Sequence, residues 1–339
     1  MITSFKTIDK HKSVVIIGIG ATNKYYMEVV KPESVEEAQK VFGLCSLTDA
    51  YELLADGHEG EDIFLLNIED MHDYLDAARL LRSYTFSYIV PIDVFLSSNF
   101  TDPTKDTMQT YYVQYLLQQT HKDNSSIILA TDKHADLYED VDAFLEDMTD
   151  RLQGFKANAS TSDVHENIIF VANNLEDVEY ANVILARMIL NSEVNEYPYE
   201  NRRRMAVFDI DHTDKVMDMA YFRNHADDSV TVENLLNLSS GESPIKIFTN
   251  YRICVYIGRE LSFDDFIGSL YTMYRKQQIA LKVDTYLDQM VGVLITAYKI
   301  DDIYAEEDPF HPGTVRIILK YSIRPVGCTE RFIQRMVTA

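Results

Sequence analysis

The residues best suited to chemistry follow a hydrophobic segment in the second half of the chain. Residues 206–210 read Ala-Val-Phe-Asp-Ile and lead into an Asp-x-Asp-x-Thr motif formed by Asp209, Asp211 and Thr213. Carboxylates can act as nucleophiles, and neighbouring carboxylates can hold a magnesium ion. Aspartate is also favoured in turns that follow strands, so the alternative is that Asp209 and Asp211 are turn and capping residues.

This motif resembles the nucleophile motif of haloacid-dehalogenase-like phosphatases. The resemblance implies that Asp209 would attack phosphorus, that Asp211 would serve as acid and base, and that magnesium would lie between them. Residues 245–250 (IKIFTN) are similar to the second motif of that family, with Thr249 binding phosphate. A magnesium-dependent phosphohydrolase is therefore one hypothesis for this chain.

The later motifs of that family fit less well. Lys282 and the Asp301-Asp302 pair could stand for the third and fourth motifs. Lys282 lies within an amphipathic run, however, and Asp301 lacks the usual preceding glycine. The long stretch before residue 206 also has no role in such an enzyme. The phosphohydrolase is therefore the second hypothesis for this chain, and a generic α/β binding module is the third.

Other cofactor and metal motifs are incomplete. Gly18 and Gly20 follow a hydrophobic segment, as in dinucleotide-binding loops, but Asn23 replaces the third glycine. The nine histidines show no metal-binding spacing. The three cysteines stand far apart in the sequence: Cys45, Cys254 and Cys328. We therefore expect neither a cofactor nor a metal.

Charge is distributed unevenly along the 339 residues. The net charge is −23, of which residues 1–258 carry −22, whereas five basic residues face one acid from Pro309 onward. An acidic chain argues against nucleic acid as a partner, because phosphate binding needs a basic face. Copies of an acidic body with a basic tail would attract one another head to tail; a solvated acidic surface is the alternative.

Signals for export or membrane insertion are not evident. The first twelve residues contain no apolar region typical of a signal peptide, and no apolar run approaches the length of a membrane span. The odd number of widely spaced cysteines fits synthesis in a reducing compartment. We expect no membrane anchor.

Residues 13–258 alternate strand-like and helix-like patterns. Apolar runs predict buried strands at residues 13–20, 62–68, 86–92, 125–130 and 167–172. Helical patterns cover residues 34–43, 69–83, 102–119, a stretch up to about 152, and 175–190, and the first begins with Ser34 and Glu37 as a capping box. Residues 154–163 and 191–204 read as polar linkers. Repeated strand–helix units predict an α/β body with a mostly parallel sheet.

Residues 259–339 predict a separate α+β assembly domain. Ser262 and Asp265 are expected to cap a long helix whose apolar face comprises Phe263, Phe266, Ile267, Leu270, Tyr271 and Tyr274. A second helical stretch runs to about Met290. Residues 291–304 and 314–323 predict a hairpin, and residues 332–339 form a last extended segment.

The order of these segments resembles the tail sheath family of contractile phages, R-type bacteriocins and related injection machines. Residues 14–43 (VVIIGIGATNKYYMEVVKPESVEEAQKVFG) form a strand ending in Gly-x-Gly and then a Ser-x-x-Glu-Ala-x-x-x-Phe-Gly helix. Residues 261–339 combine two helical stretches with the ending TVRIILKYSIRPVGCTERFIQRMVTA. The proline-glycine start common in the family is missing, so an N-terminal arm, residues 1–12, would be short.

The resemblance implies a structural subunit rather than an enzyme, with no cofactor. Copies would polymerise helically around a tail tube, and contraction would drive the tube through the host envelope. The implied partners are further copies of the chain, the tail tube protein, and baseplate and tail terminator proteins. The protein would be made in the host cytoplasm and would end up in the virion tail.

The resemblance also implies strand exchange between neighbouring copies, by the N-terminal arm and by a C-terminal arm at residues 330–339. The candidate exchange residues are Ile2, Phe5, Ile8, Phe332, Ile333, Met336 and Val337. Candidates for facing the tube are Arg275, Lys276 and Lys282. From the residues alone, a C-terminal strand that pairs within its own sheet is the alternative.

Overall fold

The structure is a computed structural model that describes residues 9, 11–58, 61–70, 73–81, 83–92, 126–158, 167–176, 178, 180–200, 205–210, 218–225, 229–238, 246–307 and 314–327. The chain divides into two compact units: Met1–Glu193 with Pro198–Phe248, and Val194–Tyr197 with Thr249–Ala339. The domain boundary expected at residues 258 and 259 falls inside helix α7 (Phe248–Glu260). The helix expected at 102–119 and both terminal arms, apart from a few residues before 13, lie outside the described residues.

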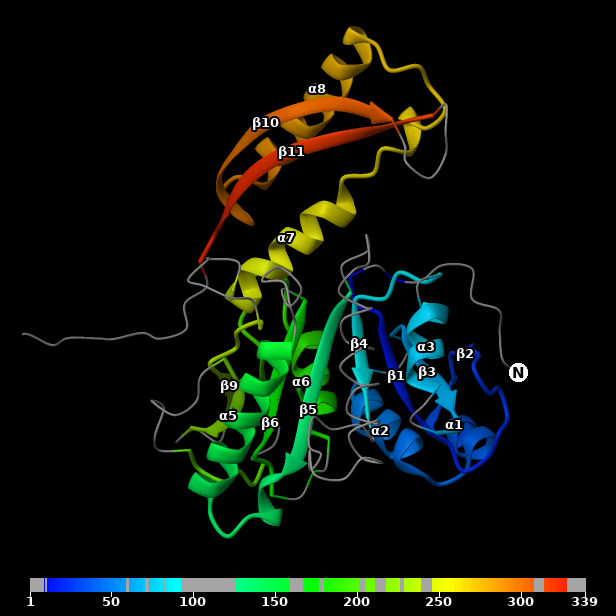
Figure 1. Cartoon of the computed structure of the whole chain (residues 1–339), viewed down its shortest axis with the longest axis vertical. Coiled ribbons are helices and arrows are strands. Elements are labelled where there is room, and N and C mark those ends of the chain that lie inside the picture. Colours follow the sequence, from blue (N-terminus) through cyan, green and yellow to red (C-terminus); the bar gives the residue numbers. More distant parts are fainter. Residues whose placement is uncertain are drawn as a thin grey trace, which may run out of the picture. The chain divides into compact units, whose positions relative to one another are not determined.

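A six-stranded sheet forms the centre of the first unit (Figure 1), with strand order β2-β3-β1-β4-β5-β6. Its strands are β1 (Val14–Ile19), β2 (Val29–Val30), β3 (Ile63–Ile68), β4 (Tyr88–Pro91), β5 (Ile127–His134) and β6 (Ile168–Asn173). Pairing is parallel from β3 through β1, β4 and β5 to β6, whereas β2 is antiparallel to β3. The α/β body with a mostly parallel sheet is confirmed.

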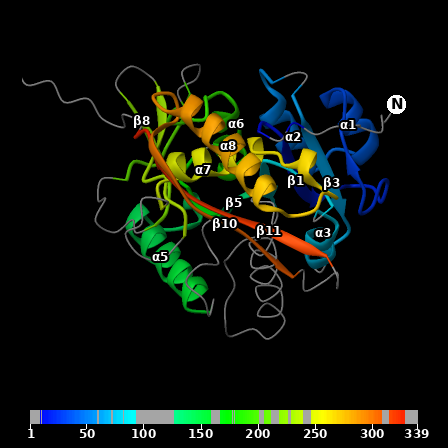
Figure 2. The same ribbon diagram turned by 90° about the horizontal axis from the view of Figure 1, so that it is seen from above.

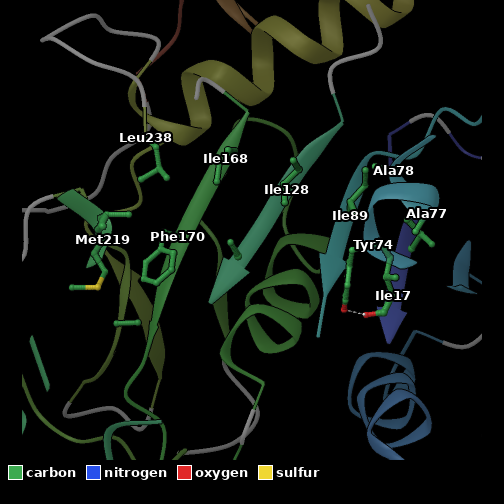
Figure 3. Close-up of a cluster of buried hydrophobic side chains, with 14 of the residues drawn as sticks. Ile17, Tyr74, Ala77, Ala78, Ile89, Ile128, Ile168, Phe170, Met219 and Leu238 are labelled. Carbon is green, nitrogen blue, oxygen red and sulfur yellow. Dashed lines mark hydrogen bonds between the residues drawn. The ribbon is translucent and has the colours of Figure 1, made fainter. Parts of the chain in front are cut away.

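The parallel strands read as nearly continuous apolar runs because both faces of the sheet are covered. Every residue of β3, β4 and β6 is buried. Alternate strand residues such as Ile17, Ile128 and Phe170 point to one face, where they form a single buried cluster with residues of the helices on that face (Figure 3).

Helices lie on both faces of this sheet. The helices of the first unit are α1 (Val35–Phe42), α2 (Ser46–Ala55), α3 (Tyr74–Leu81), α5 (Val141–Asn158) and α6 (Ala181–Leu190). Helices α3 and α5 contribute to the cluster of Figure 3, while α2 and α6 pack against each other and against strands β1 and β3–β6. The predicted start of α1 is confirmed, because Ser34 accepts a hydrogen bond from the Glu37 N–H at 3.2 Å.

Several boundaries differ from the sequence prediction. Helix α2 was not predicted. Helix α5 continues to Asn158, through the first residues of the expected linker at 154–163, and α3 begins only at Tyr74. A three-stranded sheet, β7 (Tyr199–Glu200), β9 (Val230–Glu233) and β8 (Tyr221–Asn224), was also not predicted, and β7 lies within the expected loop at 191–204.

The second unit consists of α7, α8 (Met273–Met290) and a hairpin of β10 (Ile295–Glu307) and β11 (Val315–Pro325). Figure 1 shows the two long strands as a curved ribbon with α8 along it, and Figure 2 shows them from above. Ile253, Ile257, Ile279, Val283 and Leu287 of the two helices form its core with Leu294, Ile295 and Ile303. The predicted hairpin is confirmed.

The prediction of a long helix from Ser262 onward is wrong. Asp264–Phe266 form a single 3-10 turn, Gly268 adopts a φ of 77°, and α8 begins at Met273 after its N-cap Thr272. A positive φ interrupts a right-handed helix, and the Thr272 hydroxyl, which accepts from the Arg275 N–H at 3.2 Å, starts a new one. The apolar spacing of residues 263–274 therefore belongs to an irregular segment.

None of the helices in the described part of the chain has the length and hydrophobicity needed to cross a lipid bilayer.

Candidate assembly interface

Those residues of the phosphatase hypothesis that the structure describes are not brought together into a site. Val207 makes one isolated bridge with Leu175, and Asp209 is exposed. Asp211 lies outside the described residues. Thr249, expected to bind phosphate, is buried in the first turn of α7. Nothing in this arrangement supports the hypothesis.

The remaining residues of that hypothesis lie on α8 and on the hairpin. Lys282 pairs with Asp265 at 3.1 Å, and Asp302 lies 3.7 Å from Lys276. Asp301 accepts from Lys299 at 2.7 Å and from the Ser322 hydroxyl at 2.5 Å, and these bonds lower the pKa of its carboxyl. Among the described residues, no three His, Cys, Asp or Glu side chains are grouped so that they could hold a metal.

The Gly-x-Gly segment at the end of β1 serves packing rather than phosphate binding. The Gly20 N–H donates to Asn67 Oδ1 at 2.8 Å, and Asn67 Nδ2 donates to the carbonyls of Thr22 (2.8 Å) and Lys24 (3.0 Å). A Cβ on Gly20 would lie 2.6 Å from Asn67 Oδ1, so the glycine is required by this close approach. The N–H group that a phosphate would need is therefore already bonded.

The carboxyl ends of β1 and β4, where open α/β sheets bind ligands, are also bonded internally. The Tyr74 hydroxyl donates toward the Ile17 carbonyl at 3.2 Å (Figure 3) and also contacts the Ile92 carbonyl. Asn182 Nδ2 donates to the carbonyls of Pro91 (2.8 Å) and Leu129 (3.0 Å). The α/β body thus uses its usual ligand position to hold helices α3 and α6.

The hairpin of the second unit has unpaired edges instead. Among the described strands, β10 and β11 pair with each other alone, in an antiparallel register from Ile295↔Pro325 to Glu307↔Val315. Each strand therefore has an outer edge whose N–H and C=O groups have no strand partner in the described chain. Such edges are templates for pairing with another strand.

The two faces of the hairpin differ in chemistry. Ile317, Leu319, Tyr321 and Ile323 of β11 pack against the core of the second unit. The opposite face carries charges that pair across the strands: Arg316 with Glu306, and Lys320 over the ring of Tyr304 at 5.3 Å. An added strand would therefore need one apolar and one polar face.

Known proteins match this chain in structure but not in sequence. No family model matches the sequence, and no curated protein matches it. Among solved structures, the chain superposes with a TM-score of 0.65 on the sheath complex of PVC, an extracellular contractile injection system, in its contracted state. The two chains are 10% identical, and the match covers 97% of this chain and 92% of the other.

A second similar structure is a chain of the anti-feeding prophage (AFP) baseplate in its contracted state. It superposes with a TM-score of 0.67 at 14% identity, over 100% of this chain and 96% of the other. The chain has the fold of a contractile-sheath protein. The resemblance predicted from the sequence is confirmed at the level of the fold, although no sequence comparison detects it.

The three candidate tube-facing cations of this sheath fold all have partners within the second unit. Besides Asp265, Lys282 approaches the rings of Phe263 (5.7 Å) and Phe266 (5.6 Å). Arg275 lies over the Phe266 ring at 5.8 Å and donates to Gln278 at 2.8 Å. Part of the positive charge predicted to face a tube therefore stabilises the 263–266 turn against α8.

A pocket of about 280 Å³ lies in the second unit beside these residues. It is lined by residues of the irregular segment, of α8 and of β11: Phe263, Phe266, Ile267, Gly268, Ser269, Tyr271, Ile279, Val315, Ile317 and Leu319. Sequence reasoning missed this site. The alternation of apolar residues in β11 was a visible signal, but the contribution of residues 263–271 was not, because a helix was expected there. The seven candidate exchange residues lie outside the described residues.

Proposed function

We propose that this protein is the subunit of a contractile sheath, that it polymerises helically through its hairpin, and that it is not an enzyme. The observation that carries the proposal is the β10–β11 hairpin, whose outer edges have no strand partner in the described chain, on a fold shared with a sheath complex over nearly its full length. Strands added from neighbouring copies would satisfy these backbone groups.

The uneven charge supports the same proposal. The first unit carries almost all of the net charge of −23, whereas the last residues are basic. Contacts between the acidic body of one copy and the basic end of another would add to strand exchange. A head-to-tail contact that does not close into a ring produces a helical polymer.

The mechanical role follows from the assembly. A sleeve of such subunits around a tail tube would contract by re-docking the bodies while the exchanged strands stay linked. The tail tube, baseplate and tail terminator proteins would be the partners, and the particle would be a phage-type tail or an injection system. Arg275, Lys276 and Lys282 remain our candidates for the tube contact, and they would act beside their internal partners.

Electron microscopy of the purified protein tests the proposal. We expect tubes, rings or long polymers that grow with protein concentration. Deleting residues 332–339, or separately residues 2–8, is expected to leave a folded, soluble chain that no longer polymerises. Circular dichroism melting alongside sedimentation measures both properties. A chain that stays monomeric at every concentration and salt would refute the sheath role.

A parallel assay tests the absence of catalysis. Asp209→Asn is expected to leave folding, assembly and background phosphate release unchanged, since Asp209 is exposed and belongs to no cluster of metal-ligating side chains among the described residues. Magnesium-dependent phosphate release that Asp209→Asn abolishes would instead establish the enzyme.

A further inference from the structure

The loop that follows β1 is strained and is held in place by hydrogen bonds. Tyr25 and Met27 have φ angles of 51° and 55°, a left-handed conformation that residues with a Cβ rarely adopt. The Met27 N–H donates to the Asn67 carbonyl at 2.9 Å, and the Glu28 N–H donates to the Tyr25 carbonyl at 3.0 Å. Together with the side-chain bonds of Asn67, these contacts fix a conformation that the chain would otherwise avoid.

This conformation displays two neighbouring aromatic rings to solvent. Tyr25 is 38% exposed and Tyr26 is 43% exposed. Tyrosine is enriched at protein interfaces, because its ring offers a large contact area and a polar end. A loop that is already fixed loses little conformational freedom when it binds. Backbone strain beneath an exposed aromatic pair therefore indicates an interaction surface.

Acidic side chains border the rings. The Tyr26 hydroxyl donates to Asp73 Oδ1 at 2.9 Å, and this bond together with the charges of Glu69 and Asp76 raises the pKa of the hydroxyl. Asp76 is paired with Arg79 at 2.6 Å, whereas Glu69 is exposed and has no ionic partner among the described residues. Aromatic rings beside carboxylates bind guanidinium groups through cation–π contacts and charge-assisted hydrogen bonds. We call the following residues the tyrosine patch: Tyr25, Tyr26, Glu69, Asp73 and Asp76.

Matching cations occur at the other end of the body. Residues 202–204 are three consecutive arginines, the longest run of Lys and Arg in the sequence. The run lies outside the described residues and connects β7 with Met205. The Met205 carbonyl accepts from Asn224 of β8 at 2.8 Å. Ala220, just before β8, donates to the Phe170 carbonyl of β6 at 2.9 Å, so the run is attached beside β6.

The patch and the arginine run cannot meet within one chain. Tyr26 forms a bridge with Asn67 of β3, and strands β1, β4 and β5 separate β3 from β6 (Figure 1). At about 4.8 Å between neighbouring strands, β3 and β6 lie about 19 Å apart. A loop of four residues that is anchored at both ends reaches about 10 Å from its anchors. A contact between the two features therefore requires two copies of the chain.

We propose that the tyrosine patch binds residues 202–204 of a second copy, with guanidinium groups over its rings and against Glu69. Lys24 is the neighbouring cation, and the carboxylates of Glu69 and Asp73 outnumber it. Because the two features lie at opposite ends of the same sheet, the contact is head to tail and repeats from copy to copy. The inference rests on the proposed function, since it assumes that copies associate, and it adds a contact between bodies that does not involve the hairpin.

Complementary charge reversals test the contact. Glu69→Arg and Arg203→Glu are each expected to raise the concentration needed for polymerisation about tenfold or more, because each brings like charges together. An equimolar mixture of the two variants should polymerise near the wild-type concentration. In an alternating polymer, each reversed patch meets a reversed run and each unchanged patch meets an unchanged run. Asp49→Arg, which reverses an exposed carboxylate on α2, is the matched control and should have little effect.

The mixture separates this contact from an effect on folding or from a contact within one chain, since neither would be repaired by mixing. A mixture that polymerises no better than its components would overturn the inference and leave the sheath role intact. Single variants that polymerise like the wild type would do the same. A wild-type chain that never polymerises would refute the proposed function itself.

The rings give an independent readout. Tyr25→Asn removes the ring but keeps a residue that tolerates the left-handed conformation, so the melting temperature should not fall. The concentration needed for polymerisation should rise about tenfold. Tyr25→Phe retains the ring and should polymerise like the wild type, as should Leu137→Asn at an exposed apolar residue outside the patch. A Tyr25→Asn chain that polymerises like the wild type would contradict the proposed contact.

Discussion

The parallel sheet of the first unit and the hairpin of the second differ in how completely the chain covers them. In β3 and β6 every residue is buried. In β11 no residue is buried, and in β10 Ile295 and Ile303 alone are. The first sheet is covered on both faces within the chain, whereas the hairpin is left largely uncovered by the described residues.

The difference extends to the polar groups. In the α/β body, side chains such as Asn67, Tyr74 and Asn182 bond the backbone groups at the loop and strand ends where a ligand would bind. In the second unit, Tyr271 and Asp302 bond one edge of the hairpin, and the other edge has no such side chains in the described chain. A protein that covers one strand edge and leaves the other exposed directs strand pairing to the exposed edge.

The largest expected effect on the free energy of unfolding separates the buried sheet of the first unit from the exposed hairpin of the second. Phe64 of β3 is fully buried against Phe86, with ring centroids 5.2 Å apart. Phe64→Ala is expected to lower the free energy of unfolding by about 3–5 kcal/mol in urea denaturation. Ile318→Ala, on the charged face of the hairpin, should cost less than about 1 kcal/mol. Similar costs would mean that the hairpin is as well packed as the body.

A smaller effect is expected at the Gly-x-Gly loop. Asn67→Ala removes the side chain that bonds Gly20, Thr22 and Lys24 and leaves partly buried backbone groups without this partner, at a cost of about 1–3 kcal/mol. Lys24→Ala is the control, because Lys24 contributes its carbonyl and not its side chain. If both variants unfold at the same urea concentration, the loop is not held by Asn67.

Tyr271→Phe tests whether the hydrogen bond from Tyr271 to Ile303 protects the outer edge of β10. It removes the hydroxyl that donates to Ile303 and should cost about 0.5–1.5 kcal/mol. We also expect new association through β10, measured by sedimentation in a chain that lacks residues 2–8 and 332–339. Tyr274→Phe on the exposed start of α8 is the control. Unchanged association would show that the hydroxyl does not protect this edge.

The smallest effect concerns Asp301 on the exposed hairpin. Bonds from Lys299 and Ser322 lower the pKa of this carboxyl below its ordinary 3.8, so its contribution to stability is present above that pH and is lost as the pH falls through the folded value. Asp301→Asn should therefore lower the melting temperature slightly at neutral pH and not at all in strong acid. A difference that persists in strong acid would exclude this ionisation as the cause.

Much of the fold was predictable because its signals are local. The runs at 13–20, 62–68 and 167–172 are almost continuously apolar, as expected of strands covered on both faces, and each became a strand of the sheet. Helix α1 followed from Ser34 and Glu37. The hairpin followed from two long β-rich runs on either side of a turn.

The errors arose where local signals compete. Residues 263–274 have helical spacing, but Gly268 with its positive φ and the N-cap Thr272 divide them into a turn and the start of α8. The hydrophobic segment at 206–210 suggested a catalytic strand, yet Val207 makes a single bridge and Asp209 faces solvent. A short motif specifies residue types, and whether those residues converge depends on contacts distant in sequence.

The amino-acid sequence by itself determined the class of the body, the terminal hairpin and the acidic character of the chain, because hydrophobic periodicity, capping residues and charge are properties of neighbouring residues. Only the tertiary structure decided that the Gly-x-Gly loop and the strand ends of the body are bonded internally, and that side chains bond the backbone of β10 at Ile303. Those features depend on Asn67 meeting Gly20, on Tyr74 meeting Ile17 and on Tyr271 meeting Ile303, pairs that are 47, 57 and 32 residues apart. Such distances place them beyond any local pattern, so folding alone brings them together.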